Sequence, residues 1–199
     1  MFNFLRKKKS ISTKERENEI EKKFDQWVQY IKSTGYPNTA AATLAINTLK
    51  VCMVESSIKD DKIAKNGYAL FDFTYFCYFT FRLALCQKAT QEFVYSYDAF
   101  VQKLIALCFS HLFGISEEKI VRLIVSRGEE YERLVSCDNA VYEMKCALTQ
   151  FVEKDMADAP ELNAVLITGI FDNFNLHVTL SNYVSETLHK LENTVSKTL

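Results

Sequence analysis

The most informative stretch of the chain is FDFTYFCYFTFR, residues 71–82, which lies inside a longer apolar segment, residues 68–88. Aromatic residues interleaved with threonine have a real preference for strands. About twenty residues without a turn signal nevertheless favour a helix, because strands usually run for about five or six residues. On a helix, this segment carries apolar side chains on every side, which is typical of a buried position. The sequence therefore predicts a central, aromatic-rich helix.

Amphipathic spacing, capping residues and glycine stops predict further helices on both sides of this segment. Ser12 and Glu15 form a capping box, and Gly35 and Pro37 end the helix that follows. The expected helices cover approximately residues 12–34, 39–59, 97–113, 116–134, 138–156 and 160–195. No linker divides them. We predict an all-α, single-domain helical bundle of six or seven helices over residues 12–199, preceded by a flexible N-terminal segment, residues 1–11.

Composition excludes several classes of protein. The 199 residues are 48% hydrophobic and 25% charged, which excludes a disordered chain. Five glycines and two prolines are too few for the many turns of a sandwich or barrel. Twenty-four basic and twenty-five acidic residues leave a net charge of −1, whereas nucleic-acid binders usually have a basic face. We therefore expect no nucleic-acid partner.

The six cysteines indicate a reducing compartment. None is spaced as C-x-x-C, and no pattern resembles a secreted disulfide framework. We predict reduced, mostly buried cysteines and a cytoplasmic protein without a signal peptide. The six are Cys52, Cys77, Cys86, Cys108, Cys137 and Cys146.

Two segments raise the question of membrane contact. Residues 67–86 are long enough to span a bilayer, but Asp72 and Arg82 would each cost about 2.5–3.5 kcal/mol at its centre. We therefore expect a buried core helix. The N-terminus combines apolar residues with a basic run, as weak interfacial anchors do. A solvated terminus is the alternative. The residues concerned are Phe2, Phe4, Leu5, Arg6, Lys7, Lys8 and Lys9.

Candidate ligand-binding residues come from two places. Asp72 and Arg82 lie ten residues apart in the sequence. On a helix that separation is about 15 Å and places them on different faces, so each must find a partner on another helix, reach solvent or snorkel. In an apolar seam over residues 167–195, His177 and Ser181 are polar neighbours on one face. Structural ion pairs and a satisfied core histidine are the alternative interpretations. The full candidate set is His177, Ser181, Asp72, Arg82, Tyr75 and Tyr78.

Motifs for catalysis and metal binding are absent from the sequence. It has no G-x-S-x-G motif, no phosphate loop and no zinc spacing. One E-x-x-H occurs at residues 186–189, whereas di-iron bundles need two. The charged run at residues 127–133 is interpreted as a solvated face, a helix break near Gly128 or a contact patch. We therefore expect that the protein is not an enzyme and that it binds neither a cofactor nor a metal ion.

The sequence thus predicts a non-enzymatic cytosolic helical protein that acts through a protein partner, as inhibitors, immunity proteins, adaptors and regulators do. Such a role predicts an exposed apolar or aromatic patch. One alternative is a small-molecule or lipid binder, and another is a peripheral membrane protein held by residues 2–9. The sequence is also compatible with a homodimer. The aromatic pocket of the first alternative would be lined by Phe73, Tyr75, Phe76, Tyr78 and Phe79.

Overall fold

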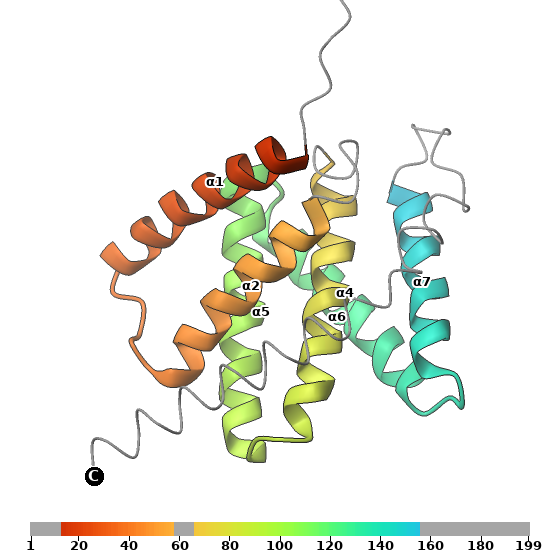
Figure 1. Cartoon of the computed structure of the whole chain (residues 1–199). Helices are drawn as coiled ribbons and strands as arrows, with labels where there is room; N and C mark the ends of the chain where they lie inside the picture. Colours follow the sequence, from red (N-terminus) through yellow and green to blue (C-terminus); the bar gives the residue numbers. More distant parts are fainter. Residues whose placement is uncertain (1–12, 58–65, 156–199) are drawn as a thin grey trace, which may run out of the picture.

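The computed structural model describes residues 13–57 and 66–155, and within them every regular element is a helix (Figure 1). The prediction of an all-α fold is confirmed. The expected helix over residues 160–195, with His177 and Ser181, lies outside the described residues, as does the N-terminal segment, residues 1–11. The helices are α1 (Thr13–Ser33), α2 (Ala40–Ser57), α4 (Gly67–Cys86), α5 (Gln91–Phe113), α6 (Glu117–Val135) and α7 (Ala140–Asp155).

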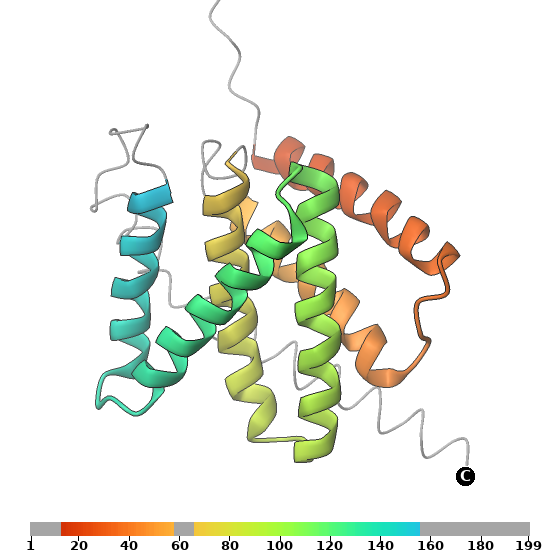
Figure 2. The same cartoon turned by 180° about the vertical axis from the view of Figure 1, so that it is seen from behind.

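Helix α4 is the centre of the arrangement, because it packs against α2, α5, α6 and α7. In Figure 1, α2 crosses in front of α4 and α5, and α1 packs on α2. Figure 2 shows the opposite face, where α6 crosses α4 diagonally and leads to α7. Helices α5 and α6 meet at the turn around Gly114 and diverge from there (Figure 2).

Helix α4 is a buried core helix, as its all-round apolar character predicts. Thirteen of its twenty residues are buried. The side chain of Asn66 caps its first turn by accepting hydrogen bonds from the backbone N–H groups of Tyr68 (3.0 Å) and Ala69 (3.2 Å). By length and composition α4 could cross a membrane, yet 72% of its most apolar window is buried inside the fold. Its apolarity is thus accounted for by the core.

One expected helix boundary is wrong, and the alternative of a helix break near Gly128 is not observed. Helix α5 begins at Gln91, not near residue 97, because Thr90 is its N-cap and accepts from the N–H of Phe93 at 3.4 Å. Helix α6 runs without a break through Gly128. A Cβ at Gly128 would lie 3.0 Å from the hydroxyl oxygen of Tyr75, so this glycine permits the close crossing of α4 and α6.

Candidate functional site

Asp72 forms a buried ion pair with Arg127. The Nε of Arg127 donates to Oδ1 of Asp72 at 2.8 Å, and the side chains of Arg127 and Asp72 are only 7% and 0% exposed, respectively. The Arg127 guanidinium also lies over the ring of Phe151, with its Cζ 3.7 Å from the ring centroid. Of the alternatives expected for Asp72, the structure shows a partner on another helix, Arg127 of α6. This pair joins α4 to α6 in the core and leaves Asp72 out of reach of solvent.

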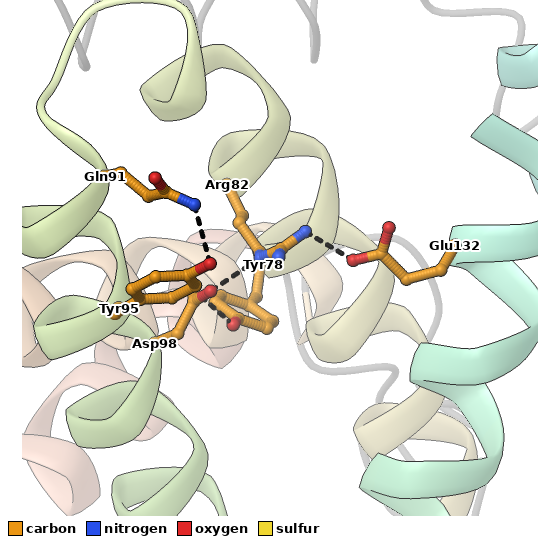
Figure 3. A network of polar contacts seen from close by, with 6 residues as sticks. All are labelled: Tyr78, Arg82, Gln91, Tyr95, Asp98 and Glu132. Carbon is orange, nitrogen blue, oxygen red and sulfur yellow. Dashed lines mark hydrogen bonds and ion pairs between the residues drawn. The ribbon is translucent and has the colours of Figure 1, made fainter. Parts of the chain in front are cut away.

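Arg82 lies at the centre of a second network, which joins α4, α5 and α6 (Figure 3). Its Nε donates to Oδ2 of Asp98 at 2.6 Å, and its Nη1 donates to Oε1 of Glu132 at 2.7 Å. The Tyr78 hydroxyl donates to the other carboxylate oxygen of Asp98 at 2.8 Å. The structure thus brings together Tyr78 and Arg82 of the predicted set. Asp98 and Glu132 complete the network and were not identified from the sequence.

A surface depression, hereafter the Arg82 groove, lies beside this network, with a volume of about 270 Å³. Four of its lining residues, which form its floor, belong to α4; one wall is Gln102 of α5 and the other is α6. Three of its floor residues are aromatic, and its α6 wall combines apolar and acidic side chains. The lining residues are Tyr75, Tyr78, Phe79, Arg82, Gln102, Ile124, Val125, Gly128, Glu129 and Glu132.

The polar network fixes the positions of its side chains. Both carboxylate oxygens of Asp98 accept hydrogen bonds, one from Tyr78 and one from Arg82. Burial, reinforced by the nearby Asp98 carboxylate, holds the pKa of Tyr78 well above its ordinary value. Tyr78 therefore stays a neutral hydrogen-bond donor. The arrangement fixes the positions of three helices beside the groove.

Exposed apolar side chains gather on α6 near the groove. Val121 is 48% exposed and Val125 is 52% exposed. With Gly128, Glu132 and Val135 they are spaced by four, three, four and three residues, which places all five on one stripe of the helix. Among the described residues, the other large exposed apolar side chains are Tyr30, Tyr95 and Tyr142.

Several other predictions are resolved by the packing. All five residues of the predicted aromatic pocket are buried. Tyr75, Tyr78 and Phe79 also line the Arg82 groove, whereas Phe73 and Phe76 do not. The seven predicted membrane-contact residues, from Phe2 to Lys9, lie outside the described residues.

The charged run over residues 127–133 is not one solvated face. Arg127 and Tyr131 point into the core, where both are buried. They continue the inward spacing of Ile120 and Ile124 on α6. Glu129 and Glu132 are exposed and lie along the groove, so this run contributes to both the core and the surface.

The cysteines form no disulfide, as predicted. Cys86 and Cys137 are exposed, and the exposure of Cys86 corrects the expectation that it is an apolar core residue. They lie at the end of α4 and in the turn between α6 and α7, where the packed core stops. Over residues 13–57 and 66–155, no group of three or more His, Cys, Asp or Glu side chains is placed to hold a metal ion.

Known proteins add no further constraint on function. No protein-family model matches the chain, and neither a curated protein nor a solved structure matches it significantly. The Arg82 groove is therefore the main structural feature that bears on function.

The buried tyrosines predict alkaline unfolding. Burial raises the pKa of Tyr36 to about 12 and holds those of Tyr97 and Tyr131 well above their ordinary value. Tyrosines in the unfolded chain ionise near pH 10, so above that pH the unfolded state binds fewer protons than the native state. Stability must then fall as the pH rises.

We expect tyrosinate absorbance to show a cooperative step in an alkaline titration, at the same pH as the loss of far-ultraviolet circular dichroism. Complete ionisation of the tyrosines while the helical signal persists would contradict the buried placement of Tyr97 and Tyr131.

Proposed function

We propose that this protein acts by binding another protein, with the Arg82 groove as the docking surface. The main observation behind this proposal is that Val125 is 52% exposed on the wall of a groove whose floor is aromatic. Exposed apolar surface next to fixed polar groups is typical of interaction sites. The function requires no catalytic group.

The size and shape of the groove favour a partner helix over an enclosed small molecule. Its volume is about 270 Å³, which is smaller than the pockets that usually enclose small molecules. The exposed stripe on α6 runs from Val121 to Val135. At about 1.5 Å per residue, its length is about 21 Å. A partner helix of about four turns would match that length, and helices commonly bind by laying an apolar face into a groove.

The walls of the groove are held in place before any partner binds. Arg82 contacts α5 through Asp98 and α6 through Glu132, so its guanidinium fixes the separation of the two walls. A docking surface that is already ordered loses less conformational entropy on binding. The network therefore supports recognition.

Photo-crosslinking tests the proposal directly. A photo-reactive phenylalanine analogue in place of Val125 should capture a discrete protein partner in cells that produce the chain. The same analogue in place of Tyr142, which is 63% exposed on α7 and outside the groove, is the matched control. The captured protein is then purified, and its dissociation constant for the unmodified chain is measured by calorimetry.

We expect Val125→Glu to weaken that affinity by at least about tenfold, the effect of an interface residue worth about 1.4 kcal/mol. Tyr142→Glu should leave the affinity unchanged. Equal capture from both positions, or a dissociation constant that Val125→Glu does not alter, would contradict docking at the groove.

A further inference from the structure

The α6 wall of the Arg82 groove carries two acidic side chains on the same side of the helix. Glu129 and Glu132 are three residues apart, so they are neighbours on the helix surface, and both line the groove. Among the described residues, the side chain of Glu129 has no hydrogen-bond or ion-pair partner. Glu132 is 53% exposed and pairs with Arg82, which Asp98 also holds. Both carboxylates can therefore accept a further cation.

The local charge balance differs from that of the whole chain. Within the described part of the chain, Arg82 is the one cation among the groove-lining residues and their network, whereas Asp98, Glu129 and Glu132 are three anions. The complete chain is nearly neutral, with a net charge of −1. A local excess of negative charge attracts basic side chains and opposes acidic ones.

Apolar and acidic groups also alternate along the groove at helical spacing. Val125 lies four residues before Glu129 and seven before Glu132, so all three face the same side of α6. Next to Glu129, Gly128 lets α6 pack closely on the hydroxyl of Tyr75, which a Cβ would approach to 3.0 Å. The wall thus offers an apolar contact and, one turn further, a carboxylate.

We infer that the partner is a protein presenting a basic amphipathic helix, with an apolar residue against Val125 and a lysine or arginine one turn away against Glu129 and Glu132. This inference rests on the proposed docking function and adds the chemistry of the partner. The partner's cation is held by the two carboxylates while Arg82 stays on Asp98.

Selection of short helical peptides tests the inference and does not require the natural partner. A display library of helices, randomised along one face, is selected against the immobilised full-length chain. We expect enriched helices to carry lysine or arginine one turn from an apolar residue. Their affinity should fall about tenfold with Glu129→Lys and less with Glu129→Gln, and only the wild-type chain should show a strong dependence on salt.

A matched control is provided by Glu118 at the start of α6, which is 75% exposed and outside the groove. Glu118→Lys makes the same change of charge and should leave peptide affinity unchanged. Circular dichroism of each variant checks that the helices are intact, as expected for an exposed position such as Glu129.

Failure of the inference is distinguishable from failure of the proposed function. Enriched helices without a basic residue that still lose binding with Val125→Glu would overturn the inference and leave the docking groove standing. Helices that Val125→Glu does not affect would overturn both. A crosslink from position 125 only to residues 156–199, or only to a second copy of the chain, would also overturn the inference, because the groove would then be filled by this protein itself.

Discussion

Replacing Arg127 with methionine should lower the free energy of unfolding by about 3–5 kcal/mol. The substitution takes the guanidinium away from the Asp72 carboxylate, whose side chain is 0% exposed. It also removes the guanidinium that lies 3.7 Å from the centroid of the Phe151 ring. A buried charge that loses its partner carries the full cost of its desolvation. Urea unfolding followed by circular dichroism measures the change, with an unaltered m value showing that the same surface unfolds.

The double variant Asp72→Leu with Arg127→Met separates the ion pair from the packing around it. Replacing both partners with apolar side chains removes the stranded charge, so the double variant should regain much of the stability that the single variant loses. Arg122→Met is the surface control, because Arg122 pairs with Glu118 where the two side chains are 77% and 75% exposed. A loss for Arg127→Met no larger than that for Arg122→Met would show that the buried pair contributes little.

The central helix was predicted correctly because the apolar segment is too long for a strand, despite the strand propensity of its residues. Residues 67–86 contain no turn signal, and an uninterrupted segment of that length exceeds an ordinary strand. Gly114 likewise ends α5 as a glycine stop should, with a φ of 66° and its N–H bonded to the carbonyl of Ser110 at 3.0 Å. These features depend on local sequence alone, which is why they were predictable.

The partners of the buried charges could not be predicted in the same way. From hydropathy, Asp72 and Arg82 each required either a partner on another helix or access to solvent, and the structure gives each of them a partner on another helix. Arg127 is 55 residues from Asp72, and Glu132 is 50 residues from Arg82. Which residues meet over such separations depends on how α4, α5 and α6 cross, and local patterns do not specify crossing angles.

The same limit applies to the Arg82 groove. Tyr75, Tyr78 and Arg82 were candidates from the sequence because polar groups stand out in an apolar helix. Val125 and Glu129 were missed, since an exposed valine and a surface glutamate are ordinary on any helix. They become informative only because the fold places them in the lining of one groove with Tyr75, Tyr78 and Arg82 of α4.

The sequence of the charged run at residues 127–133 does indicate which of its side chains are buried. Ile120, Ile124, Arg127 and Tyr131 follow the spacing of four, three and four residues that marks one helix face. The charges of the run indicate a solvated face, whereas the helical spacing of Arg127 and Tyr131 with the two isoleucines indicates that both lie in the core. The structure agrees with the spacing, since Tyr131 is completely buried.

Tyr131→Ala should therefore lower the free energy of unfolding by about 3–5 kcal/mol, which is typical for removal of a large buried aromatic side chain. The Tyr131 ring lies 5.3 Å from that of Phe79, 6.0 Å from Phe76 and 6.1 Å from Phe151, measured between centroids. Its loss would leave a cavity where α4, α6 and α7 meet. Thermal and urea unfolding of the variant measure the effect.

Tyr131→Phe is the variant that identifies the cause. Among the described residues, the Tyr131 hydroxyl is buried without a hydrogen-bond partner, so it contributes a desolvation cost and no compensating bond. Removing it while keeping the ring should leave the free energy of unfolding unchanged or raise it by about 1 kcal/mol. If Tyr131→Phe instead destabilised the protein as much as Tyr131→Ala, the hydroxyl and not the packed ring would be the stabilising group, and the aromatic cluster would not be what holds α6 and α7 against α4.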